Sequence, residues 1–272
     1  MRPEVLACLA CPYCGLGLSA VDGALRCANG HSFDLARQGY VTLLPAGSRA
    51  VGDDAAMVAA RAAFLATGAY APLTTALVAA ATPVAGVVLD VGAGPGQHVA
   101  AVLDAAPDAA GIALDASRYA ARRAARAHPR AGAVVADAWT GLPVRTGTIA
   151  VVLDVFSPRN GAETARVLRP GGLLVVVTPG PDHLSGLVDV LGGLQVDAAK
   201  ETRLAAALEP HLTPLDRTEH RWALTLSHAD AAHAVAMGPS ARHLTDLDAA
   251  VGALPDPVEV TASIVVTRYR RD

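Results

Sequence analysis

The sequence predicts an α/β protein whose mostly parallel sheet carries a small metal-binding module at its N-terminus. Between residues 86 and 180, five short apolar runs alternate with helical windows, which is typical of a parallel sheet covered on both faces. A glycine-rich turn follows the first run, and open α/β sheets bind ligands at the carboxyl ends of their strands. All four cysteines lie within residues 1–45, which sets that segment apart.

The bulk composition narrows the class of protein. The 272 residues suffice for one large domain with a small appendage. A content of 52% hydrophobic and 17% charged residues is a folded, globular balance. The net charge of −3 argues against nucleic-acid binding driven by the charge of the whole protein, because such binding relies on neutralising phosphates. Only a local basic patch on the surface could then bind nucleic acid through its charge.

The apolar stretches of the sequence indicate in which cellular compartment the protein is expected. No apolar stretch reaches 18 residues and no apolar run follows a basic start, so we expect a cytoplasmic protein without membrane contact. In that compartment, paired cysteines are more often metal ligands or catalysts than parts of a disulfide framework.

The cysteines predict a small β-rich module built around zinc. Cys11 and Cys14 have two residues between them, and Cys27 and His31 have three. Zinc takes four such ligands in a tetrahedron, and two short chelating loops supply them in pairs. Cys8 is left over, and ligand exchange with it stays open. Four protein ligands close the shell, so the metal is structural and contributes roughly 10–16 kcal/mol of folding free energy.

Residues 46–85 predict a linker followed by helices. The segment "PAGSRAVGDD" is rich in proline, glycine and charge, as linkers are. Asp53 or Asp54 is placed to cap a first helix, which "GAYAPL" (68–73) ends. An alanine-rich second helix then runs toward Thr82.

Residues 86–272 predict the main domain. The five strand candidates are "GVVLDVGAG", "GIALDAS", "AVVADAW", "IAVVLDVFSP" and "GGLLVVVTPG". The helical windows between them are 97–106, 117–128 and 160–169. Two later strands, 220–227 and 258–270, are expected to pair antiparallel at the edge of the sheet. Ser227 and Asp230 predict a capping box between them.

The glycine-rich turn predicts the ligand. It reads D-x-G-x-G-x-G, which lacks the spacing of the dinucleotide fingerprint and the lysine of a P-loop. The next two strands also end in acids, where a carboxylate suits ribose hydroxyls and an adenine amino group. Each acid alone is explained equally well as a cap or turn residue, but three at successive strand ends favour adenosine. The predicted contacts are Asp90, Gly92, Gly94, Gly96, Asp115, Asp137 and Ala138.

This arrangement resembles the class I S-adenosylmethionine-dependent methyltransferases over roughly residues 86–180. Longer motifs resemble, nearly end to end, the 23S ribosomal RNA (guanine-N1)-methyltransferases, closest to the actinobacterial branch that includes tylosin-resistance enzymes. The motifs are "GHSFDLARQGYVTLL" (30–44), "RAAFLATGAYAPL" (61–73), "DVGAGPG" (90–96), "RRAARAHPRAGAVVADAW" (122–139), "DVFSPRN" (154–160), "TPGPDHL" (178–184) and "AMGPSARH" (236–243).

The resemblance implies a function and further site residues. It implies methyl transfer from S-adenosylmethionine to N1 of a guanine in a 23S rRNA hairpin loop. It also implies a zinc module that helps recognise RNA, and a homodimer. Tyr70 and His183 become cofactor contacts with the glycine loop, whereas without the motifs Tyr70 reads as a packing aromatic and His183 as a turn residue. The alternatives are a small-molecule methyltransferase of antibiotic metabolism, against which the zinc module speaks, and a non-catalytic RNA-binding relative.

Four questions stay open at the level of sequence. Residues 1–50 carry four arginines against three acids, +4 − 3 = +1, which is little charge for an RNA-binding module. The densest basic run is Arg118, Arg122, Arg123, Arg126 and Arg130, which reads as an RNA contact or as a solvated helix face. The base that removes the N1 proton is unassigned among Asp154, His183 and the carbonyls of "FSPRN". Arg159 reads equally as a phosphate or guanine O6 contact and as a surface arginine.

Overall fold

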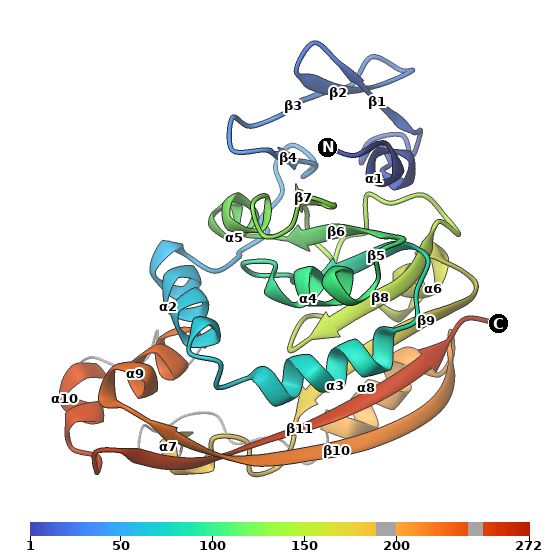
Figure 1. Ribbon diagram of the computed structural model, residues 1–272. Coiled ribbons are helices and arrows are strands. Elements are labelled where there is room, and N and C mark those ends of the chain that lie inside the picture. Colours follow the sequence, from blue (N-terminus) through green and yellow to red (C-terminus); the bar gives the residue numbers. More distant parts are fainter. Residues whose placement is uncertain (189–199, 239–246) are drawn as a thin grey trace.

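The computed structural model describes residues 1–188, 200–238 and 247–272 of the chain, so residues 239–243 of the "AMGPSARH" motif lie outside the described part. One small and one large sheet make up its β-structure (Figure 1). The small sheet contains β1 (Leu18–Val21), β2 (Ala24–Cys27) and β3 (Ser32–Asp34). The large sheet contains β4 (Tyr40–Thr42), β5 (Gly86–Val91), β6 (Ala109–Asp115), β7 (Ala131–Val135), β8 (Ile149–Val155), β9 (Leu168–Pro179), β10 (Thr213–Leu226) and β11 (Val258–Arg270).

The large sheet has the order β10-β11-β9-β8-β5-β6-β7-β4. All pairs from β9 to β4 are parallel, and β9, β11 and β10 pair antiparallel. The five predicted strands are therefore present, and the predicted edge pair is confirmed with β11 at the predicted bounds. Because β5 lies between β6 and β8, the carboxyl ends of these three strands meet at one edge of the sheet.

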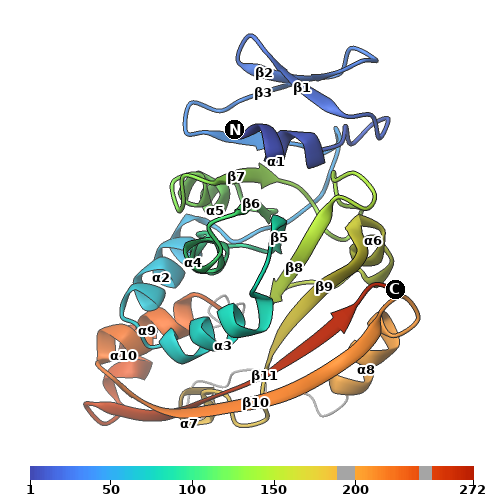
Figure 2. The same ribbon diagram turned by 45° about the vertical axis from the view of Figure 1, so that its right-hand side comes forward.

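Helices cover both faces of this sheet. The helices are α1 (Pro3–Cys8), α2 (Ala55–Ala66), α3 (Ala71–Ala81), α4 (Gln97–Ala105), α5 (Arg118–Ala124), α6 (Gly161–Val167), α7 (Ser185–Val188), α8 (Lys200–Leu208), α9 (His228–Ala236) and α10 (Leu247–Gly252). Figure 2 shows α3 and α4 on one side of the strands and α6 and α8 on the other. The core is correspondingly split: Val88 packs with α3 and α4, whereas its neighbours Val87 and Leu89 pack with α6, α8 and the N-terminal module.

The N-terminal segment is tied to the large sheet by more than a linker. β4 adds to the edge of that sheet, where Tyr40 pairs parallel with Ala133 of β7. Val5 and Leu25 belong to the same core as the strand residues on that face. The small sheet thus lies over the β7 end of the molecule, and the β10–β11 pair lies at the opposite end (Figure 1).

The helix caps predicted from the sequence are present at the starts of α2 and α9. Asp54 accepts the N–H of Met57 at 2.9 Å and caps α2, whereas Asp53 pairs with Arg61 at 2.7 Å. At the start of α9, Ser227 Oγ accepts the N–H of Asp230 at 3.1 Å and donates to its carboxylate at 2.7 Å. Within the described ranges no single helix is long and apolar enough to cross a membrane; only α2 and α3 together, bent by 87°, have that length and composition.

The basic run on α5 divides into two parts. Arg118, Arg122, Arg123 and Arg126 are exposed. Arg130 instead donates to the backbone carbonyls of Ala106 and Ala109 at 2.7 and 2.6 Å, and also to those of Leu103 and Pro107. It therefore adds a further donor to carbonyls at the end of α4, where those of Leu103 and Ala106 already accept the N–H groups of Ala106 and Ala109, and its side chain is committed to the fold.

Candidate active site and metal centre

The four predicted zinc ligands lie together at the end of the small sheet. Cys11 and Cys14 lie on a turn closed by the N–H of Gly15, which donates to the carbonyl of Cys11 at 2.8 Å. Cys27 ends β2, and His31 follows a second turn just before β3. The four ligand atoms all lie within 4.8 Å of one another. Both chelating pairs thus converge on one point.

The spacing of these atoms fits zinc and excludes a disulfide. The sulfurs of Cys14 and Cys27 are 3.7 Å apart, and Nδ1 of His31 is 3.4 Å from Cys11 Sγ and 3.3 Å from Cys27 Sγ. A tetrahedron with Zn–S bonds of about 2.3 Å places its ligand atoms roughly 3.5–3.8 Å apart, whereas a disulfide needs about 2.05 Å. Cys8 is elsewhere, with its sulfur 3.8 Å from the carbonyl oxygen of Thr148.

The surroundings of Cys27 lower the pKa of its thiol and so favour the metal-binding thiolate. Burial disfavours its thiolate, but hydrogen bonds from the backbone and ring of His31 and from the backbone of Asn29 outweigh burial and lower its pKa to about 6. Because thiolates are the zinc-binding form, this environment favours the closed, structural site that the spacing predicts.

The glycine loop follows β5 and leaves no room for side chains. Gly92 and Gly94 have φ of 70° and 53°, in the left-handed region that favours glycine. A Cβ at Gly92 would lie 2.5 Å from Cβ of Ser157, and one at Gly94 would lie 3.1 Å from the side chain of Arg61. The loop is held against β6, since the N–H groups of Gly92 and Ala93 both donate to the carbonyl of Leu114.

Asp115 ends β6 opposite this loop. Its two carboxylate oxygens accept the N–H groups of Gly94 and Ser117, each at 2.8 Å. Burial raises the pKa of Asp115, and those two N–H groups act against burial. The carboxylate is therefore fixed in direction while it keeps lone pairs for a further donor.

A cavity of about 460 Å³ opens in front of the loop. Five predicted cofactor contacts line it: Gly92, Gly94, Asp115, Asp137 and Ala138. Residues that the sequence analysis did not assign to the cofactor also line it, among them Asp53, Arg61, Phe156 and Ser157. The hydroxyl oxygen of Ser157 is buried and has no hydrogen-bond partner among the described residues. A buried polar atom of this kind is expected where a bound ligand completes the hydrogen bonding. The volume of the cavity, the glycine loop on its wall and the carboxylate of Asp115 together fit a ligand of the size of a nucleoside.

Gly96 and Asp90 lie behind this cavity. Gly96 is the N-cap of α4, and a Cβ there would lie 2.9 Å from Cβ of Ala127, so it is needed for close packing. Asp90 is 1% exposed and accepts a backbone hydrogen bond from Val99 of α4. Burial, and to a lesser degree the charges of Asp115 and Asp154, raise its pKa to about 8.

A second cavity of about 280 Å³ adjoins the first and shares Arg61, Phe156 and Ser157 with it. Tyr70 and His183, the two remaining predicted cofactor contacts, line this second cavity. They come from α3's N-cap and from the turn after β9, and Tyr70 Oη lies 2.9 Å from His183 Nε2. Five of the predicted cofactor residues therefore line the first cavity and two line the second, whereas Asp90 and Gly96 line neither.

The hydrogen bonds of His183 define its tautomer. Nδ1 accepts the backbone N–H of Ser263 at 3.2 Å. A neutral imidazole that accepts at Nδ1 carries its proton at Nε2, so Nε2–H donates to the oxygen of Tyr70. The Tyr70 hydrogen is then available to a ligand, and His183 has no lone pair left for a general base. Asp154, another candidate base, is buried and pairs with Arg159 at 3.4 Å.

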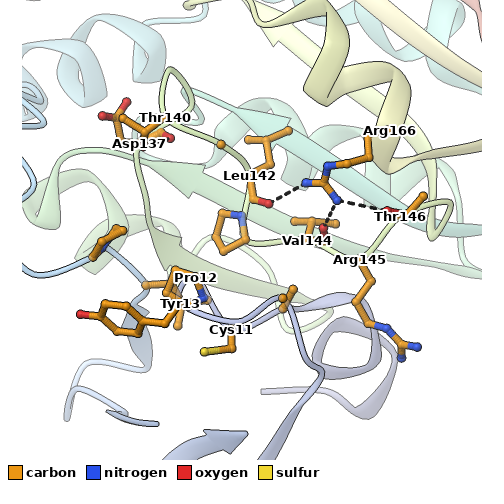
Figure 3. A pocket seen from close by; sticks show the side chains of 16 residues that line it. Cys11, Pro12, Tyr13, Asp137, Thr140, Leu142, Val144, Arg145, Thr146 and Arg166 are labelled. Atoms are coloured by element: carbon orange, nitrogen blue, oxygen red, sulfur yellow. Dashed lines mark hydrogen bonds between the residues drawn. The ribbon is translucent and has the colours of Figure 1, made fainter. Parts of the chain in front are cut away.

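A groove of about 540 Å³ separates the zinc module from the main domain. Figure 3 shows Cys11, Pro12 and Tyr13 on one wall and the chain from Leu142 to Thr146 on the other. Arg166 braces that wall by donating to the carbonyls of Leu142 and Val144 at 2.8 and 2.7 Å (Figure 3). The groove reaches Asp137, which also lines the first cavity. The groove and the first cavity therefore border each other at Asp137.

The cavity residues that the sequence did not indicate as cofactor contacts come from two separate segments of the chain, one of which, "FSPRN", was expected only at the substrate edge. Arg61 and Asp53 come from α2 and the segment before it, while Phe156 and Ser157 follow β8. No spacing connects these segments, which meet only in the folded chain. The one usable signal is position: residues directly after a central parallel strand lie at the ligand-binding edge.

The fold and site define a class I S-adenosylmethionine-dependent methyltransferase with a zinc-ribbon module. A family model described as "RlmA, N-terminal", a zinc ribbon, matches residues 9–50, and a model described as "Methyltransferase domain" matches residues 88–172. A Bacillus halodurans structure assigned as a methyltransferase has a TM-score of 0.52 at 14% identity and covers 72% of this chain and 97% of its own. That likeness supports the fold alone.

Full-length relatives define the family. The 23S rRNA (guanine(748)-N(1))-methyltransferase of Streptomyces fradiae is 49% identical over 99% of both chains. A Micromonospora griseorubida protein assigned as a 23S rRNA (guanine-N(1)-)-methyltransferase is 51% identical over 99% of both. The chain belongs to the 23S rRNA (guanine-N1)-methyltransferases, as its motifs predicted.

We expect His31→Ala to abolish stoichiometric zinc binding and to unfold the small sheet, residues 18–34, because metal binding supplies much of the folding free energy of so small a sheet. Metal analysis and hydrogen exchange of the purified variant measure both effects. Cys8→Ser is the matched control and should retain one zinc per chain. Full zinc content in His31→Ala, or its loss in Cys8→Ser, would contradict the ligand set.

We expect Asp115→Asn to weaken S-adenosylmethionine binding about 10- to 150-fold, since hydrogen bonds to a charged group contribute about 1.5–3 kcal/mol. Isothermal titration calorimetry measures the dissociation constant. Asp104→Asn is the control, because the Asp104 side chain is 75% exposed on α4 and outside both cavities. An unchanged constant for Asp115→Asn would remove this carboxylate from the cofactor site.

The raised pKa of Asp90 predicts a pH-dependent stability without cofactor. The folded chain holds this proton up to about pH 8, whereas the ordinary value is 3.8, so the folded state binds more protons between these limits. The free energy of unfolding therefore falls as pH rises through that window. Asp90→Asn should flatten this slope and have the higher Tm at pH 9. Thermal unfolding from pH 5 to 9 measures it, and an unchanged slope would refute it.

Proposed function

We propose that the protein transfers a methyl group from S-adenosylmethionine to N1 of a guanine in a 23S rRNA hairpin loop. The observation that carries this is the pair of joined cavities at the carboxyl edge of the parallel sheet, one suited to a nucleoside cofactor and the other adjoining it. When bound, S-adenosylmethionine supplies the methyl group: its S–CH3 bond breaks as the N1–CH3 bond forms, and the N1 proton is released with S-adenosylhomocysteine.

We propose that the first cavity holds the cofactor. Asp115 accepts the ribose hydroxyls, Gly92 and Gly94 allow close approach to the loop, and Asp137 with Ala138 contacts the adenine side. Asp90 and Gly96 support the loop from behind, through the bond to Val99 and the packing at the start of α4. Tyr70 and His183 contact the reactive end of the cofactor with their rings from the wall of the second cavity, which leaves the Tyr70 hydroxyl hydrogen for the substrate.

An unpaired base is the substrate that this geometry suits. N1 lies on the Watson–Crick edge of guanine, so the enzyme cannot reach it inside a base pair, and a hairpin loop supplies it unpaired. The groove beside the zinc module supports RNA entry from that side, because it leads to Asp137 at the cofactor site. Tyr13, 49% exposed on the groove wall, offers a ring for stacking.

Further parts of the proposal concern organisation. We propose three units: a zinc-binding RNA-recognition module (1–45), a linker with helices (46–85) and a methyltransferase domain (86–272). A homodimer, a cytoplasmic location and macrolide resistance of the tylosin type belong to the same proposal, and they rest on the sequence analysis.

Incubation with S-adenosylmethionine and a 23S rRNA hairpin tests the activity. The first hairpin to use contains the guanine corresponding to the position named in the Streptomyces fradiae relative. We expect one methyl group per hairpin, located at guanine N1 by mass spectrometry. The methyl group should be absent when that guanine is replaced by adenine, because adenine presents an amino group where guanine presents O6 to the site.

The control is a second methyltransferase of known activity on the same RNA preparation. Failure of this protein on 23S fragments and on whole ribosomal RNA, with that control active, would refute the proposed substrate. Methylation of a macrolide precursor in its place would support the small-molecule alternative.

A further inference from the structure

Phe156 occupies the junction of the two cavities. It follows β8 directly, lines both cavities, and is 36% exposed. Its backbone φ is 54°, in the left-handed region. For a bulky residue this conformation is unfavourable and is found mainly where function requires it.

Local structure and core packing do not account for this conformation. Three described residues other than glycine have positive φ: Asp22, Leu184 and Phe156. Asp22 lies in the turn between β1 and β2, where aspartate tolerates it, and Leu184 is 8% exposed within the core. Phe156 lies at the bend directly after β8 and belongs to neither core cluster, so burial does not offset its strain.

The surroundings of the ring form a wall suited to an aromatic ligand. Its centroid lies 5.5 Å from the ring of His183 and 6.4 Å from that of Tyr70. Proteins that act on single bases hold them by stacking on aromatic side chains and by hydrogen bonds to the base edges. The second cavity, about 280 Å³, is of a size for one base rather than for a whole cofactor.

The same cavity contains donors for the guanine edge. Arg159 lines it, and arginine is the residue that most often recognises guanine O6. Burial raises the pKa of the Tyr70 phenol, so its hydroxyl stays protonated, and the tautomer of His183 leaves that proton for a ligand. Adenine presents an amino group where guanine presents O6, so two donors there disfavour adenine.

We infer that the second cavity receives the target guanine and that Phe156 is the positioning residue on which this base stacks. The inference rests on the proposed function. Because Phe156 and Ser157 also line the cofactor cavity, a base stacked there lies at the passage between donor and acceptor. The strain at Phe156 thus serves to hold the ring at that passage.

Three variants of Phe156 test this inference with the hairpin assay. Phe156→Ala should lower kcat/KM for RNA about 5- to 150-fold, because stacking on one base contributes about 1–3 kcal/mol. Phe156→Tyr keeps the ring and should recover most of that loss. Phe156→Gly removes both ring and strain, so it should lose activity as Phe156→Ala does while its Tm equals or exceeds that of the wild type.

Calorimetry with S-adenosylmethionine separates the two cavities. For all three variants the dissociation constant should rise by less than kcat/KM falls, because Phe156 borders both cavities but its stacking contact belongs to the base. Tyr119→Ala is the matched control: Tyr119 is 39% exposed on α5, outside both cavities, and its loss should leave activity and cofactor binding unchanged.

Two results would overturn the inference. One is wild-type kcat/KM in Phe156→Ala and Phe156→Gly. The other is a cofactor dissociation constant that rises as much as kcat/KM falls, which would assign Phe156 to the cofactor. Failure of the proposed function is distinguishable from both, because the wild-type protein would then form no N1-methylguanine.

Discussion

The parallel pairing of β5 with β6 on one side and β8 on the other is the constraint on which the site depends. Asp90 of β5 is in register with Ala113 of β6 and Leu153 of β8, so the three strands end at the same level. The glycine loop, Asp115 and Phe156 each follow one of these ends. Helices on both faces return the chain without obstructing this edge, which leaves it open to ligands.

Patterns local in the chain made much of this predictable. Apolar runs gave the five parallel strands, because strands buried on both faces must be apolar throughout. The zinc set was predictable because chelating pairs depend on short spacing, and Cys11 with Cys14 and Cys27 with His31 keep that spacing in the fold. Asp115 and Asp137 were predictable because their position after a strand brings them to the cavity, whereas Asp90, within its strand, lies behind it.

What the sequence could not show depends on contacts between distant segments. β4 is only three residues long, and its pairing with β7 has no periodicity to reveal it. Arg130 sits in a run of arginines at helical spacing, and only its approach to the carbonyls after α4 distinguishes it. The strain at Phe156 is a property of backbone geometry, so an ordinary aromatic in the sequence gave no sign of it.

The zinc module has a small net charge, and it is attached to the large sheet mainly by apolar packing and by β4. Val5 and Leu25 share a core with the large sheet, so the module is fixed by apolar packing as well as by β4. A module held this firmly has no need of a strong field to capture RNA, because shape and stacking recognise unpaired loops. Under the proposed function, zinc keeps one wall of the groove in place. The specificity then lies in base contacts at the far end, where Phe156 divides the two cavities.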